Sequence, residues 1–174
     1  MICTKRIVFG AVFTALIIIF QFFSAFLGNQ LLTGSLVNMV LSLVALRLDL
    51  RTAICVSMIS PLAAFMLGIG PKIPIFIPFI MIANGIFVVC IYYAEKFNYA
   101  KNMKLIMFGI SASILKCVVL FFSFRLILPL FISLNEKQIA STGTLFSFIA
   151  FIACVIGFSF SLMIKDIIPS MRED

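Results

Sequence analysis

With 64% hydrophobic and 11% charged residues, and with neither His nor Trp, this chain of 174 residues is too apolar for a soluble domain. Six membrane spans of ~20 residues each would use most of its length, which excludes a separate soluble catalytic domain. The net charge of +7 would suggest nucleic acid as the partner of a soluble protein. In a membrane protein it reflects the cytoplasmic enrichment of Lys and Arg, so we expect no nucleic-acid partner.

Apolar segments alternate with short polar gaps, and the basic residues concentrate in every second gap. The predicted spans cover residues 7–27, 32–46, 52–67, 74–94, 105–126 and 142–164. The basic clusters are Lys5, Arg6, Arg47, Arg51, Lys96, Lys101, Lys104, Lys165 and Arg172. The remaining gaps hold only Lys72 and Lys137. This bias predicts an all-α integral membrane protein, a single six-transmembrane-helix bundle over residues 1–174 with cytoplasmic N- and C-termini.

The first apolar run follows Lys5 and Arg6 and continues to about Leu27. Such a run is long for the apolar region of a signal peptide. We therefore expect an uncleaved first helix. We also expect a multi-pass protein of the cell membrane, the plasma membrane of a bacterium.

The predicted spans lack the residues of several function classes. No acidic residue falls within a span and the chain has no His, whereas ion-driven transporters usually carry titratable residues in the membrane. The sequence also lacks a Gly-rich phosphate loop, a nucleophile–base set and a zinc-binding pair, and its cysteines show no metal-ligand spacing. We therefore expect that the protein is not an enzyme and that it has no catalytic residue, metal or cofactor. A partner would have to supply energy for uphill transport.

Lys116 is the strongest candidate for a functional residue. It follows Lys104 by twelve residues, or ~18 Å of helix, which lies past the midplane of a ~30 Å hydrocarbon core. A Lys at that depth costs on the order of 2.5–3.5 kcal/mol, so we expect it to face the bundle interior with Ser113 on nearly the same face. No span offers a carboxylate partner. The partner of the Lys116 ammonium is therefore either an anionic ligand or the oxygens of Asn side chains and carbonyl groups. In the structural alternative, Lys116 snorkels toward the interface or bonds to backbone carbonyl oxygens.

Other polar residues are expected in the outer half of the bundle. Asn38 and Asn84 lie within spans, and Asn29 and Gln30 lie in the first outer loop, although a buried Asn can equally bridge two helices. Arg125 is either a ligand contact or an interfacial anchor. The candidate substrate-binding residues are Lys116, Asn84, Asn38, Arg125, Asn29, Gln30, Ser113 and Phe79, the last as a possible wall for a flat ring.

Small residues form a strip in the first span. Gly10, Ala11, Thr14 and Ala15 are spaced so that another helix can approach closely. The strip predicts either docking of a partner membrane protein or packing inside the bundle.

Four segments are distinctive together: the Ala11–Ala15 strip, the stretch Leu32-Thr33-Gly34-Ser35-Leu36-Val37-Asn38-Met39, Pro61 followed by Leu67-Gly68-Ile69, and Pro74 to Pro78 followed by Asn84-Gly85. These segments resemble the substrate-binding S components of energy-coupling factor (ECF) transporters. The similarity covers most of the chain.

The resemblance implies a function. An S component binds a vitamin or similar micronutrient in a pocket that opens outward, under the loops after helices 1, 3 and 5. It docks through helix 1 on a transmembrane coupling subunit driven by two cytoplasmic ATPases, then topples to release the substrate inside. Members of the family often stack substrate on Trp, which this chain lacks. The substrate expected from Lys116 is a small molecule with an anionic or strongly accepting group. Carboxylated vitamins such as pantothenate, niacin, biotin or folate fit, and so do other nutrients.

Two other function classes remain open from the sequence. A structural membrane subunit, such as a cell-shape or cell-division scaffold, would hold Lys116 within the bundle and bind no small molecule. A self-contained facilitator or channel would conduct solute without a partner. An intramembrane enzyme is disfavoured by the missing catalytic set.

Overall fold

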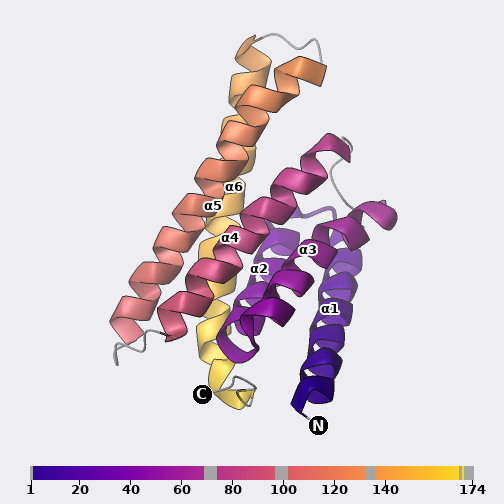
Figure 1. The fold of residues 1–174 in the computed structure, drawn as a ribbon. Helices are drawn as coiled ribbons and strands as arrows, with labels where there is room; N and C mark the ends of the chain where they lie inside the picture. The colour runs from indigo at the N-terminus through magenta and orange to yellow at the C-terminus, as the bar shows by residue number, and fades with distance from the viewer. Residues whose placement is uncertain (1, 69–73, 97–101, 132–135, 169, 171–174) are drawn as a thin grey trace.

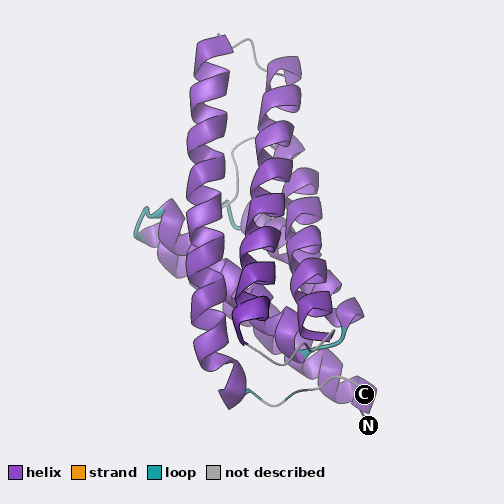
Figure 2. Ribbon diagram, turned by 90° about the vertical axis from the view of Figure 1, so that its left-hand side faces the viewer, coloured by secondary structure: helices purple, strands orange, loops and turns teal. Residues whose placement is uncertain are grey.

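The computed structural model describes residues 2–68, 74–96, 102–131, 136–168 and 170, and the regular elements among them are all helical (Figure 2). The helices are α1 (Ile2–Phe26), α2 (Gln30–Arg47), α3 (Leu50–Met66), α4 (Ile77–Lys96), α5 (Asn102–Phe131) and α6 (Glu136–Ile164). Short 3₁₀ turns, η1 (Pro74–Phe76) and η2 (Lys165–Ile167), precede α4 and follow α6. Each predicted span overlaps one helix, so the all-helical fold class is confirmed.

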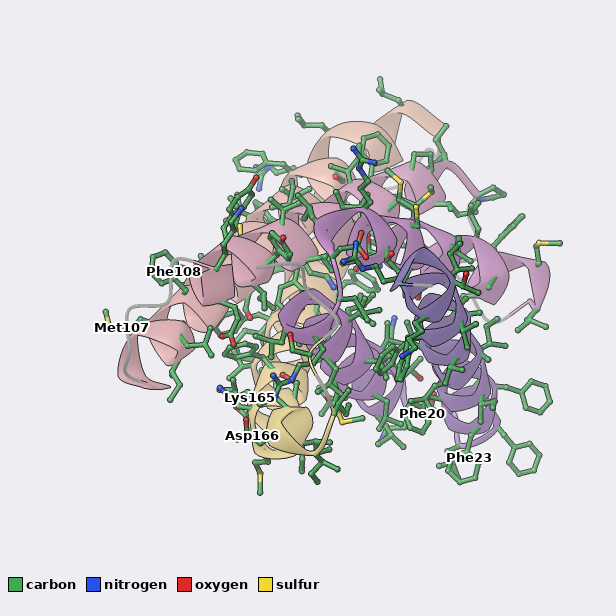
Figure 3. The ribbon with its side chains drawn as sticks, turned by 60° about the horizontal axis from the view of Figure 1, so that its bottom comes forward. Phe20, Phe23, Met107, Phe108, Lys165 and Asp166 are labelled. Carbon is green, nitrogen blue, oxygen red and sulfur yellow. The ribbon has the colours of Figure 1, made fainter. Side chains whose placement is uncertain are left out.

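Five of these helices are long and apolar enough to cross a membrane, and α3 is a shorter apolar helix of 17 residues. Their outward side chains are apolar. Figure 3 shows Phe23 on α1 and Met107 and Phe108 on α5 pointing away from the bundle, and more than half of each side chain is exposed. A surface of this kind suits lipid and would be unfavourable in water.

Polar caps and glycines end the helices where the sequence leaves the apolar pattern. Asn29 and Asp49 accept hydrogen bonds from backbone N–H groups at the starts of α2 and α3. Gly28 and Gly68 follow α1 and α3 with φ of 64° and 71°, a conformation that glycine adopts without a steric penalty. The side-chain caps and the two glycines therefore let these helices begin and end within short connections.

The six helices close into a ring. Going round the bundle, α1, α3, α4, α5, α6 and α2 each pack against the next, and α2 packs back on α1. Helix α2 also packs against α3 and α4, and it is the most buried of the five longer apolar helices. Figure 1 shows that the chain ends lie at one end of the bundle, which we call the terminal end.

The terminal half of the bundle is a packed apolar core. Its fully buried side chains include Ile17, Leu41, Val44, Phe87 and Ile91, contributed by α1, α2 and α4. A hydrogen bond from Arg47 Nε to the Lys165 carbonyl oxygen (2.7 Å) joins the end of α2 to the turn after α6. The described side chains of this half thus pack α2 against α1 and α4.

Helices α5 and α6 are much longer than their neighbours. At 30 and 29 residues they extend to ~45 Å, against ~26 Å for α3. Figure 1 shows both rising beyond the other helices at the end opposite the termini. The far end of the bundle is therefore stepped, with the ends of α1, α2 and α3 recessed beside a tall α5–α6 pair.

Glycines allow α2 and α6 to approach closely. A Cβ on Gly157 would lie 2.4 Å from the Ser35 carbonyl oxygen and 2.7 Å from the Met39 nitrogen. A Cβ on Gly34 would lie 2.9 Å from the Ala153 Cβ. Because backbone atoms cannot move aside cheaply, α2 and α6 can keep this separation only with glycine at position 157.

We expect Gly157→Ala to lower the melting temperature of the detergent-solubilised protein, with a loss of about 1–3 kcal/mol from overpacking. The matched control is Gly85→Ala on α4, where an added Cβ meets nothing within 4 Å. That change should leave the melting temperature unchanged or raise it, because Ala favours a helix over Gly. Equal melting of Gly157→Ala and the wild type would contradict the close α2–α6 packing.

Candidate functional site

A cavity of about 480 Å³ occupies the half of the bundle away from the termini, and all six helices contribute to its wall. This volume falls within the ~300–1,000 Å³ of small-molecule sites. Its polar lining residues are Gln21, Ser24, Asn29, Gln30, Thr33, Asn38, Ser60, Asn84 and Lys116. Its apolar lining includes Val37, Ile80, Leu120, Phe146 and Ile149. This mixture of apolar wall and few polar groups is typical of a ligand site.

Lys116 lies at the base of this cavity, where the packed core begins. Its side chain is 5% exposed, and its Nζ donates a hydrogen bond of 2.6 Å to Asn38 Oδ1. The same Nζ lies 5.0 Å from the centroid of the Phe87 ring, within the range of a cation–π contact. Lys116 forms no salt bridge with any carboxylate of the described residues. The hydrogen-bond acceptor and the aromatic ring at the ammonium are thus both neutral.

Asn84 is the second polar group at the base. It lies one helical turn before Phe87 on α4, so it is on the cavity side of the ring that Lys116 contacts. The side chain is 4% exposed and lines the cavity, and no described residue hydrogen-bonds its carboxamide. A carboxamide can both donate and accept hydrogen bonds. Asn84 therefore offers unused hydrogen-bonding capacity next to a cation.

The wall formed by α1 and α3 carries a different set of groups. Gln21 Nε2 donates to the carbonyl oxygen (3.4 Å) and to the Oγ (3.2 Å) of Ser60. Ser24 Oγ donates to the Phe20 carbonyl oxygen at 2.6 Å. These donors are thus satisfied within the protein, while Gln21 Oε1 is buried without a partner among the described residues.

Aromatic side chains close one side of the cavity near its mouth. Phe76 of η1 stacks on Phe124 of α5 with ring centroids 4.3 Å apart, and Phe124 contacts Phe146 of α6 at 4.5 Å. Phe146 itself lines the cavity. The stack joins the chain before α4 to the α5–α6 pair and gives the cavity a rigid apolar side.

Five of the predicted substrate-binding residues line this one cavity: Lys116, Asn38, Asn84, Asn29 and Gln30. Three do not line it. Arg125 is exposed, Phe79 is half-buried, and Ser113 lies one turn deeper with its Oγ bonded to the Gly109 carbonyl oxygen at 2.8 Å. The sequence analysis did not single out Gln21, Ser24 or Ser60. A lone Gln in an otherwise apolar span was the signal that would have indicated the first of them.

The small-residue strip of α1 is divided between two faces. Gly10 is buried, and a Cβ there would lie 2.7 Å from Thr52 Cγ2, so this glycine serves packing against α3. Thr14 Oγ1 donates to the Gly10 carbonyl oxygen at 2.8 Å. Ala11 and Ala15 are exposed. Only the two alanines remain on the outer surface as predicted docking residues.

No protein-family model, curated protein or solved structure matches this chain. The resemblance to S components therefore stays an expectation from the sequence motifs.

We expect Asn38→Leu to lower the melting temperature, because it leaves the Lys116 ammonium buried without its hydrogen-bond acceptor, at a cost of about 1–3 kcal/mol. Lys116→Met removes the charge and should restore stability when combined with Asn38→Leu. A double-mutant cycle on the detergent-solubilised protein measures this coupling. Additive effects of the two changes would contradict the Lys116–Asn38 pairing.

Proposed function

We propose that this protein is the substrate-capture subunit of an ECF-type importer in a bacterial plasma membrane, and that it binds a small anionic solute in the cavity between its six helices. The observation that supports this most is the buried Lys116 ammonium, paired with a neutral Asn38 oxygen at the base of a cavity of about 480 Å³. A buried cation without a carboxylate partner favours binding of an anion.

The proposed topology puts both termini in the cytoplasm and the mouth of the cavity outside. The terminal end carries the described basic residues Lys5, Arg6, Arg47, Arg51 and Lys96, which favour a cytoplasmic location. The cavity lies in the opposite half, so solute would enter from outside and meet the packed apolar core before it could cross. Such a site captures a solute without conducting it, which supports a binding subunit over a channel.

Release into the cytoplasm would then require partners. We propose a transmembrane coupling subunit driven by two cytoplasmic ATPases, docked on the exposed Ala11 and Ala15 face of α1. Neither residue contributes to the cavity wall. Docking and substrate binding would therefore use separate faces of the same helix.

The proposed substrate is a carboxylated vitamin or similar nutrient. A carboxylate would accept hydrogen bonds from Lys116 and the neighbouring carboxamides, and the remainder would contact Val37, Leu120 and Phe146. Charge-assisted bonds of this kind are stronger than neutral ones. The apolar lining would contribute affinity by excluding water.

The Lys116–Asn38 hydrogen bond also favours one alternative, a structural membrane subunit in which Lys116 joins α5 to α2 and binds no small molecule. Affinity purification from the native host separates the two. The importer predicts recovery of a multi-span coupling protein with two ATPases. Recovery of cell-shape or cell-division proteins instead would support the scaffold.

We expect Lys116→Met to weaken solute binding at least ~30-fold, because it removes the charged partner of the anion, while the melting temperature stays near that of the wild type. Purified protein is incubated with pantothenate, niacin, biotin and folate together with small molecules extracted from the host, and retained solutes are identified by mass spectrometry and titrated.

The control for this test is Lys96→Met, which removes an exposed Lys at the terminal end of α4. It should bind as the wild type does. Equal retention by Lys116→Met and the wild type, or no retained anion in the wild type, would contradict the capture of an anionic solute.

A further inference from the structure

The two sides of the cavity differ in the hydrogen-bonding groups that they leave unused. Helices α1 and α5 are opposite one another in the ring, each separated from the other by two helices in either direction, and Figure 1 shows them on opposite sides of the bundle. Lys116 belongs to α5, and Gln21 belongs to α1. Both line the same cavity, so a ligand within it lies between them.

The α5 side offers donors. Among the described residues the Lys116 ammonium donates one hydrogen bond, to Asn38, and an ammonium has further N–H groups to donate and accepts none. Because Lys116 donates to the Asn38 oxygen, the amide nitrogen of Asn38 is the donor that this side chain can offer to a ligand. Asn84 adds a carboxamide with no hydrogen-bond partner among the described residues. A ligand therefore needs acceptors, preferably anionic ones, at this side.

The α1 side offers acceptors. The Ser60 carbonyl oxygen can only accept, so the Gln21 amide nitrogen must face it, which leaves Gln21 Oε1 as the unpaired atom. Ser24 uses its proton on the Phe20 carbonyl oxygen and retains lone pairs. Gln21 is 5% exposed, and an acceptor buried without a partner is unfavourable. An N–H or O–H donor of a ligand placed at Gln21 Oε1 would satisfy it.

We propose that the cavity selects a bipolar solute, with an anionic group held by Lys116 at one end and an N–H or O–H donor held by Gln21 Oε1 at the other. This inference rests on the proposed function and narrows its substrate class. A solute that lacks the donor would leave Gln21 Oε1 without a hydrogen bond, and sites built around buried polar groups reject such analogues strongly. Cations are excluded as well, because the lining residues include Lys116 and no carboxylate.

Matched probes test the two ends separately. The first set contains ω-hydroxy and N-acylamino monocarboxylates, which carry both a carboxylate and a donor. The second contains their O-methyl and N-methyl counterparts, which keep the carboxylate and lose the donor. The third contains methyl esters of the first set, which keep the donor and lose the charge. Dissociation constants are measured by calorimetry on the full chain in detergent.

We expect the wild type to bind the first set on the order of 10-fold to 100-fold more tightly than the second, which corresponds to one unsatisfied buried group. Gln21→Met should reduce this ratio to about one while keeping the preference for carboxylates over esters. The control is Ser147→Ala, because Ser147 Oγ is also buried without a described partner but does not line the cavity. It should leave both preferences unchanged.

Failure of this inference is distinct from failure of the proposed function. Equal affinity of the wild type for the first and second sets overturns the bipolar solute while leaving anion capture intact, and so does an unchanged ratio in a folded Gln21→Met. Esters that bind as well as carboxylates, or no binding by any set, overturn anion capture itself. The comparison of the first and second sets on the wild type tests the bipolar solute even where Gln21→Met does not fold.

Discussion

A single positive charge inside an apolar bundle is the constraint on which the rest of the structure depends. Lys116 sits near the middle of α5, and the protein meets its charge with a carboxamide oxygen and an aromatic ring. Both partners must come from other helices, Asn38 from α2 and Phe87 from α4, so these three helices converge at one level. Below that level the described side chains form a largely apolar core, in which Ser42 and Ser161 bond to the backbone of their own helices. Above it, polar side chains line the cavity that Lys116 also lines, so a solute there would meet the ammonium.

The limits of α2 and α3 could be predicted closely because the membrane leaves few alternatives, whereas α5 ends at Phe131 and α6 begins at Glu136, outside the predicted spans 105–126 and 142–164. Backbone groups in lipid must be paired within a helix, so each apolar run becomes one helix that ends near Gly28, Asp49 or Gly68. What the sequence could not provide was the order of helices round the ring. That order depends on which surfaces fit, and the α2–α6 contact depends on a glycine at position 157 that looks ordinary in the sequence.

The candidate site could be predicted as far as residue counting gives the depth of a side chain in the membrane and the face of the helix on which it lies. Lys116 and Asn84 are polar residues well inside spans, and both line the cavity. Ser113 shares the helical face of Lys116 but lies a turn deeper, and whether the cavity extends that far depends on packing from other helices. Ser24 binds its own backbone like any serine in a helix, so nothing in its local sequence distinguishes a cavity residue from a packed one. Only the arrangement of α1 against α2 and α3 gives it that role.

Helix α1 carries both a residue of the cavity and the proposed docking residues. Its inward face carries Gln21 at the cavity, and its outward face carries Ala11 and Ala15. Gly10 packs closely against α3, so a movement of α1 has to involve α3 as well. In the proposed importer, the helix that satisfies the far end of the solute is then also the helix that meets the coupling subunit. A ligand that hydrogen-bonds to Gln21 would hold α1 against the bundle. A partner on the outer face contacts the same helix, so it would bind the filled and the empty protein with different affinity.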